Sequence, residues 1–296
     1  MRALHLLLCG LPLWCQVAAP SLGYIAEGTR LRPVFGIPAS ASVGPLLDTP
    51  EFSLVAAAPG NDFALIVRAD SGEVAVYRSG RNLEVISAAG LSPDSITMSP
   101  SGSAALLWFA DMRRFLVIRD LPTTPIAESI PLAESAAALA VSDDGQVIAG
   151  IWGSEIRVSG PQGQKIIPLD APRALAFGHD SHELAVATPH GVFLVTNDTA
   201  KLLDLSPEVM ALSFTAGNRK LTFATHSGQL TAINLSDKST IQADCGCVPQ
   251  GLLQTSGATF RFTGLRHQAF QLFDANTGQI FTVPLTSEQV IQEVVQ

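Results

Sequence analysis

The sequence predicts an all-β protein, a β-propeller in which four-stranded antiparallel sheets, called blades, surround a central axis. The first observation is a turn signal that recurs every 36 to 43 residues. A nearly constant period in this range is typical of a repeat architecture. The second is that each interval holds four short apolar segments, and the third is that no interval holds an apolar pattern of helical period. The six turns are residues 59–62, 99–102, 142–145, 178–181, 215–218 and 255–257.

Composition agrees with many short, buried strands. Of the 296 residues, 47% are hydrophobic and only 15% are charged, against about 25% charged residues in an average soluble domain. Strands that are buried on both faces leave few positions for Lys or Glu. The formal net charge of −8 argues against nucleic acid as a partner, because phosphate binding needs a basic surface.

The first nineteen residues predict a secretory signal peptide. Met1-Arg2 is a short basic start, residues 4–15 form an apolar run, and Val17-Ala18-Ala19 offers small residues before a cleavage point. The run is shorter than the roughly 20 residues of a membrane-spanning helix. We therefore expect residues 1–19 to be removed and residues 20–296 to form one domain. Pro20 makes the cleavage site imperfect, so a retained anchor or a buried strand stays open.

A lipid anchor on Cys9 or Cys15 is a weaker alternative, because the bulky Trp14 lies where such sites have small residues. After residue 19, no run of 18 apolar residues occurs, so no transmembrane segment is expected in the mature chain. The expected location is secreted or periplasmic, with association at the cell surface also open.

The strands can be assigned in chain order. Residues 24–28 and 32–38 suggest two strands, and residues 36–50, with three prolines and two glycines, suggest a loop. Six units of four strands follow, joined by turns rich in Asp, Gly, Ser and Asn. Their strands are residues 52–56, 63–67, 73–77 and 83–86; 95–98, 104–109, 115–118 and 127–130; 137–141, 147–152, 155–158 and 165–167; 174–177, 184–187, 192–195 and 201–203; 211–214, 220–224, 230–233 and 239–241; and 251–254, 259–262, 269–273 and 279–283.

The residue types within a unit indicate the place of each strand. The first strand has small and medium side chains, as in residues 137–141 (Ala-Ala-Leu-Ala-Val), which suits the crowded lining of a central channel. The second and third strands are continuously apolar, as in residues 104–109. Such strands pack on both faces against neighbouring blades.

Blade number follows from length. Six units cover about residues 52–285, and the remaining ends amount to about one more blade. We therefore favour seven blades closed by pairing of the termini, with the strands in residues 24–37 meeting a final segment near residues 290–295. Six blades with an added N-terminal edge is the alternative, and residues 287–296 could also form a short helix.

The turn-and-strand pattern Ser99-Pro-Ser-Gly-x-x-Ala105 resembles that of the WD40-like and YVTN-type propellers of bacterial exported proteins. The resemblance extends over residues 20–296 and implies architecture. The Trp-Asp dipeptide of WD40 repeats is absent, so the hydrogen-bond network that it builds is not expected here. Propellers serve as enzymes, lectins and scaffolds alike, so the fold alone does not assign a function.

Cys245 and Cys247 are the only cysteines beyond the predicted signal peptide. An even pair in an exported chain predicts a disulfide. We expect it to be structural and to hold the loop 244–249 between two blades. A redox-active pair, free thiols and a metal-ligand pair are the alternatives, although a zinc site normally has four ligands.

Five polar residues are weak candidates for ligand binding. His190, His226 and His267 lie between the second and third strands of consecutive units, and Asp70 and Asp111 occupy similar positions in the first two units. These hairpins share the face where ligands usually enter a propeller. The simpler interpretation is that they are ordinary polar hairpin tips. Residues 179–183 (His-Asp-Ser-His-Glu) resemble metal ligands but fall in a turn on the opposite face, where a solvated turn is the better interpretation.

The sequence favours a non-enzymatic exported binding or protein-interaction module, expected to be monomeric. Its partner would be an unknown protein or small ligand at the channel face, and we expect no catalytic residue, metal or cofactor. The alternative is a propeller-type hydrolase or lactonase with a metal in the central channel. Such enzymes need inward-facing carboxylates, and the predicted channel strands carry almost none.

Overall fold

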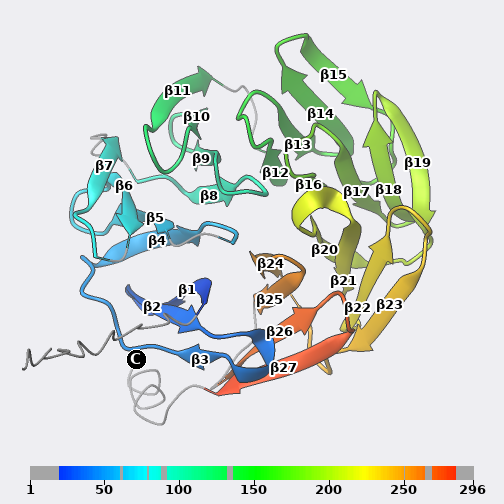
Figure 1. Cartoon of the computed structure of the whole chain (residues 1–296). Helices are drawn as coiled ribbons and strands as arrows, with labels where there is room; N and C mark the ends of the chain where they lie inside the picture. Colours follow the sequence, from blue (N-terminus) through cyan, green and yellow to red (C-terminus); the bar gives the residue numbers. More distant parts are fainter. Residues whose placement is uncertain are drawn as a thin grey trace, which may run out of the picture.

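The protein is a seven-bladed β-propeller. The computed structural model describes residues 20–60, 63–78, 80–87, 92–131, 136–249, 251–263 and 269–284. Seven antiparallel sheets stand around one axis, with strands in chain order within each sheet (Figure 1). The predicted fold class and the favoured blade number are therefore confirmed. The described residues contain no helix that is long and apolar enough to cross a membrane.

Six sheets have four strands each. They are β4 (Phe52–Ala57), β5 (Phe63–Arg68), β6 (Val74–Arg78) and β7 (Glu84–Ser87); β8 (Ser95–Met98), β9 (Ala105–Phe109), β10 (Arg114–Arg119) and β11 (Ile126–Pro131); β12 (Ala138–Val141), β13 (Ile148–Trp152), β14 (Glu155–Gly160) and β15 (Gly163–Ile167); β16 (Ala174–Phe177), β17 (Leu184–Thr188), β18 (Gly191–Thr196) and β19 (Thr199–Asp204); β20 (Val209–Phe214), β21 (Lys220–Thr225), β22 (Gln229–Asn234) and β23 (Thr240–Asp244); and β24 (Gly251–Ser256), β25 (Thr259–Thr263), β26 (Ala269–Asp274) and β27 (Gln279–Pro284). We number these blades 1 to 6.

Burial follows the predicted place of each strand. The second strands β13 and β17 are buried at every position, because both faces pack on neighbouring blades. The outermost strands β15 and β19 are mostly exposed. Tight turns between first and second strands rely on glycine, as at Gly145, whose φ of 64° is a left-handed conformation that glycine adopts without a Cβ clash.

The N-terminal strands make the seventh blade. β1 (Ser21–Glu27), β2 (Arg30–Phe35) and β3 (Ser42–Val43) form a three-stranded sheet in the described part of the chain. The segment predicted as a loop also contains a short 3₁₀ turn, Pro38–Ser40. Residues 290–295, which we expected to complete this blade, lie outside the described residues, as do residues 1–19.

The N-terminal sheet closes the ring through two apolar interfaces. On one side Tyr24 and Leu31 pack with Phe52 and Ile66 of blade 1, and the rings of Tyr24 and Tyr77 meet edge to face at 5.9 Å. On the other side, three side chains of the sheet pack with three of blade 6; the cluster comprises Leu22, Ile25, Val34, Phe270, Leu272 and Val283. Figure 1 shows β1 to β3 between the blue-cyan strands of blade 1 and the orange strands of blade 6. The ring is thus completed by packing, as solvent exclusion from the end blades requires.

Asp143 joins three blades on the turn face, which carries the turns between first and second strands. It is 8% exposed. Its Oδ1 accepts a hydrogen bond from the backbone N–H of Ser101 in blade 2 at 2.7 Å, and its Oδ2 accepts one from Asp180 in blade 4 at 2.8 Å. The Ser103 hydroxyl donates to the backbone carbonyl of Asp143. A buried carboxylate with two backbone donors is a strong, charge-assisted link.

Asn218 repeats this arrangement between blades 5 and 4. Its side-chain oxygen accepts from the N–H of His179, and its Nδ2 donates to the His179 carbonyl, both at 2.7 Å. His182, from the turn that resembled a metal site, is exposed and lies 3.1 Å from Asp144 Oδ2. Burial raises the pKa of Asp144, but hydrogen bonds from Ser142, Gln146 and His182 outweigh burial, so the pKa lies below its ordinary value. The polar groups in these turns therefore hold blades to each other.

Candidate functional site: the central channel and the loop face

The first strand of every blade faces the central channel (Figure 1), as the sequence predicted. A cavity of about 460 Å³ lies there, within the range of small-molecule sites. Its walls are mostly aliphatic, with contributions from all seven blades; they include Tyr24, Leu31, Val55, Ile96, Met98, Leu139, Val141, Leu175, Phe177, Leu212 and Leu252. The polar lining residues Ser99 and Gln254 are engaged locally, with Ala104 N and Gly257 O respectively.

Among the described residues, Arg261 is the one charged residue that lines this cavity. It comes from β25, directly opposite Leu253 of β24. Its Nη1 donates a hydrogen bond of 3.1 Å to the backbone carbonyl of Tyr24, across the interface with the N-terminal sheet. No carboxylate of the described residues forms an ion pair with it. A guanidinium has five N–H donors, and one hydrogen bond from Arg261 to a described residue is found.

Burial lowers the pKa of Arg261 to about 10, and no neighbouring acid offsets that effect. The side chain is still a cation at neutral pH, but in an environment that disfavours the charge. The electrostatic character of the channel is therefore that of an apolar cavity with a single uncompensated positive charge.

Replacing Arg261 with Met should stabilise the ligand-free protein. The folded-state pKa lies below the unfolded value, so the unfolded chain binds the proton more tightly and the cation lowers stability at every pH below about 10. Allowing for the partial exposure of the side chain, we expect the free energy of unfolding to rise by about 1–3 kcal/mol in Arg261→Met. Urea unfolding at pH 7 measures this. The control is Arg173→Met at an exposed position, which should change the free energy of unfolding by less than about 0.5 kcal/mol. A loss of stability in Arg261→Met would contradict the claim that the buried cation destabilises the ligand-free protein.

Four of the five polar candidates from the sequence lie in described hairpins. Asp70, Asp111, His190 and His226 are exposed residues between second and third strands of different blades; His267 lies outside the described residues. Their described partners are local. Asp70 pairs with Arg68 at 2.6 Å, and the hydrogen bond from Arg68 lowers the pKa of Asp70. His190 lies 3.6 Å from Asp170. A ligand-binding role for these residues stays a prediction.

The donor set does not fit a channel metal. The lining residues of the cavity include no Asp, Glu, His or Cys. Over the described residues generally, no three side chains of these types gather closely enough to hold a metal ion. Hard cations need several oxygen ligands, and zinc needs nitrogen, sulfur or carboxylate ligands. The described channel therefore lacks the groups that a metal-dependent lactonase would use.

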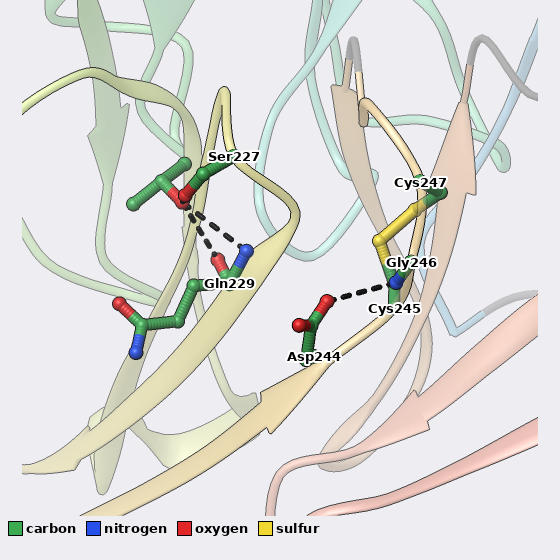
Figure 2. Close-up of a disulfide and its surroundings, with 7 residues drawn as sticks. Ser227, Gln229, Asp244, Cys245, Gly246 and Cys247 are labelled. Carbon is green, nitrogen blue, oxygen red and sulfur yellow. Dashed lines mark hydrogen bonds between the residues drawn. A yellow bond between two sulfur atoms is a disulfide. The ribbon is translucent and has the colours of Figure 1, made fainter.

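Cys245 and Cys247 are joined by a disulfide in the loop between β23 and β24, with their Cα atoms 5.1 Å apart (Figure 2). The bridge packs on the β21–β22 hairpin, where the N–H of Cys245 donates to the Gly228 carbonyl at 3.0 Å. Asp244 Oδ1 accepts from the Gly246 N–H at 2.8 Å, which tightens the turn (Figure 2). The loop between blades is thereby held against blade 5. A redox use of the pair remains an untested alternative.

Gly228→Ala should be costly because the hairpin touches the disulfide loop. Gly228 has a φ of +90°, and a Cβ there would lie 2.4 Å from the Cys247 carbonyl oxygen. We expect the free energy of unfolding to fall by about 2–3 kcal/mol. Gly246→Ala is the matched control, since Gly246 has a φ of +58° with open space around its Cβ position; it should cost only about 1 kcal/mol. Equal losses of unfolding free energy in Gly228→Ala and Gly246→Ala, measured by chemical unfolding, would mean that the close approach of Gly228 to the disulfide loop does not affect stability.

Exposed apolar side chains occur in loops between blades, and the face that carries these loops is called the loop face. Leu205 is 73% exposed and Val248 is 51% exposed, in the loops that precede β20 and β24. Met210 is also exposed, near the start of β20. Leu253, on the neighbouring strand β24, is exposed as well, but it lines the central cavity. Other exposed apolar residues, such as Ile126 and Ile166, lie singly on outermost strands. Single exposed apolar residues are normal at protein surfaces, whereas several in adjacent loops indicate a contact surface.

Sequence reasoning missed Arg261 and the loop-face residues. Arg261 stands in the alternating pattern Thr-Phe-Arg-Phe, which reads as a strand with one solvated face. Leu205 and Val248 lie in short segments for which the hydrophobic periodicity predicts loops. The one available signal was an arginine in a predicted strand. Whether that arginine lies close to the central axis depends on how the ring closes, which local sequence patterns do not show.

Comparisons with known proteins support the fold and no closer relationship. No model of a protein family matches the chain, and no curated protein matches it in sequence. Among solved structures, Kluyvelomyces marxianus Hsv2 has a TM-score of 0.58 at 10% identity, over 90% of this chain and 97% of that one. The propeller domain of Myceliophteria thermophila Cps50 (Swd1) has 0.57 at 9%, over 80% and 88%.

PorZ of Porphyromonas gingivalis, described as a surface component of the type-IX secretion system, has a TM-score of 0.59 at 12% identity, over 91% of this chain and 38% of that chain. Similarity at such low identity concerns architecture alone. Together with the sheet order around the axis, these comparisons identify the chain as a seven-bladed β-propeller.

Proposed function

We propose that this protein is an exported, non-enzymatic binding module that docks another protein on its loop face. The observation that carries the proposal is the group Leu205, Met210 and Val248, all more than 40% exposed in and beside the two loops that precede the neighbouring strands β20 and β24. Apolar side chains at the centre of an interface contribute most when a partner removes them from water. The disulfide and its contact with blade 5 restrain one of the two loops, which lowers the entropy cost of binding.

Export is part of the proposal and rests on the first nineteen residues of the sequence. A disulfide between Cys245 and Cys247 is consistent with an oxidising compartment. The structural neighbours contribute architecture only. The metal-dependent hydrolase is the less favoured function because the described channel lining offers no carboxylate or imidazole.

Site-specific photo-crosslinking in the cells that produce the protein tests the docking surface. A photoreactive residue at position 205 or 248 should give a discrete adduct with another protein. The same residue at position 126 or 166, on exposed outer strands, is the matched control and should give none. Leu205→Glu should weaken the adduct formed from position 248. No adduct from the loop positions, or equal adducts from all four positions, would overturn the proposal.

A further inference from the structure

The central cavity combines two properties that together specify a ligand chemistry. Its walls are mostly apolar side chains from seven blades, with Thr97, Ser99, Ser213 and Gln254 among them, and they favour an apolar molecular body. Its one charged group is Arg261, whose planar guanidinium matches a carboxylate in a two-pronged geometry. We propose that the channel binds a small organic acid in which a carboxylate is attached to an apolar body, with Arg261 as the recognising residue.

The position of Arg261 favours an external counter-ion over an internal one. Two other partly buried arginines have acidic partners: Arg32 pairs with Glu27, and Arg68 with Asp70 and Glu73. Arg261 has only the Tyr24 carbonyl as a described protein partner. A cation held in an apolar cavity without a counter-charge is unfavourable, and a bound carboxylate removes that penalty.

The hydrogen bond to Tyr24 also fixes the direction of the guanidinium. It ties Nη1 to the N-terminal sheet, while Arg261 also lines the cavity. Simple inorganic anions would satisfy the charge but would leave the apolar walls unused.

Ligand-observed NMR titration tests the proposal with defined probes. Hexanoate represents a free aliphatic acid, and N-acetyl-leucine represents a peptide carboxyl end. Acetate carries the charge without the body, hexan-1-ol carries the body without the charge, and inorganic phosphate is an anion of another shape. We expect hexanoate or N-acetyl-leucine to bind at least about tenfold more tightly than acetate, hexan-1-ol and phosphate. The stronger of the two acids identifies the source of the carboxylate.

Variants assign the binding to Arg261. Arg261→Met should abolish hexanoate binding, Arg261→Lys should retain it in weakened form because it keeps the charge without the fork, and Arg173→Met on the surface should bind as the wild type does. Circular dichroism checks that each variant is folded. The proposal is overturned if neither acid binds, if phosphate binds as tightly as the better acid, or if Arg261→Met binds that acid unchanged. None of these results bears on the loop face, so the two proposals can fail separately.

Discussion

Deleting residues 20–50 should abolish the cooperative unfolding transition of the protein. This segment contains β1 to β3, which cover Phe52 and Ile66 of blade 1 and Phe270 and Leu272 of blade 6. Each fully buried side chain of this size contributes about 1.5–3 kcal/mol relative to exposure. Uncovering these four therefore removes about 6–12 kcal/mol, which is comparable to the roughly 5–15 kcal/mol of net stability of a typical protein. Urea unfolding followed by circular dichroism measures the transition.

The control for this deletion is a chain that begins at Pro20, which lacks only the predicted signal peptide. It should unfold in one sharp transition, at the same urea concentration as the protein recovered from its host. If the chain that begins after residue 50 unfolds with the same midpoint and slope as the control, the N-terminal sheet does not close the ring.

Asp143→Ala should lower the free energy of unfolding by about 2–4 kcal/mol. Its carboxylate is nearly buried and accepts two backbone hydrogen bonds, from Ser101 in blade 2 and Asp180 in blade 4. A hydrogen bond to a charged group is worth about 1.5–3 kcal/mol, and truncation leaves buried N–H donors unsatisfied. Thermal and urea unfolding at pH 7 both report this loss.

Asp144→Ala is the matched control, because the neighbouring carboxylate is half exposed. Its partners Ser142 and Gln146 lie in its own turn, and its contact with blade 4, through His182, is exposed to solvent. It should cost less than about 1 kcal/mol. The free energy of unfolding of Asp143→Asn should lie between those of the wild type and Asp143→Ala, since the amide keeps one oxygen acceptor in place of two. A loss in Asp143→Ala no larger than that in Asp144→Ala would show that the bonds between blades do not stabilise the ring.

The sequence was sufficient for the architecture because the signals are local. Runs such as residues 63–67 and 184–187 are apolar at every position, and the structure buries β5 and β17 almost completely. The glycine turns between them set the period, as at Gly102 and Gly145. The short strand β3 escaped prediction, because Ser42–Val43 lies in a Pro- and Gly-rich segment that carries no strand signal.

The features with functional potential escaped prediction because they depend on the closed ring. Asp143 reads in the sequence as an ordinary turn residue, and its role appears only when the turns of blades 2 and 4 approach it. Arg261 reads as a solvated strand residue, yet it faces the cavity because Tyr24 and the N-terminal sheet lie beside β25. Contacts between residues that lie 237 positions apart leave no trace in local periodicity.

Hydrogen–deuterium exchange resolved by segment tests ring closure, the central claim, most directly. If β1 and β2 form a blade that packs on both neighbours, their amides should exchange as slowly as those of β5 and β17, because all would open only when the whole ring unfolds. Complete exchange of residues 21–35 within seconds, while β5 and β17 stay protected, would contradict a ring closed by the N-terminal sheet.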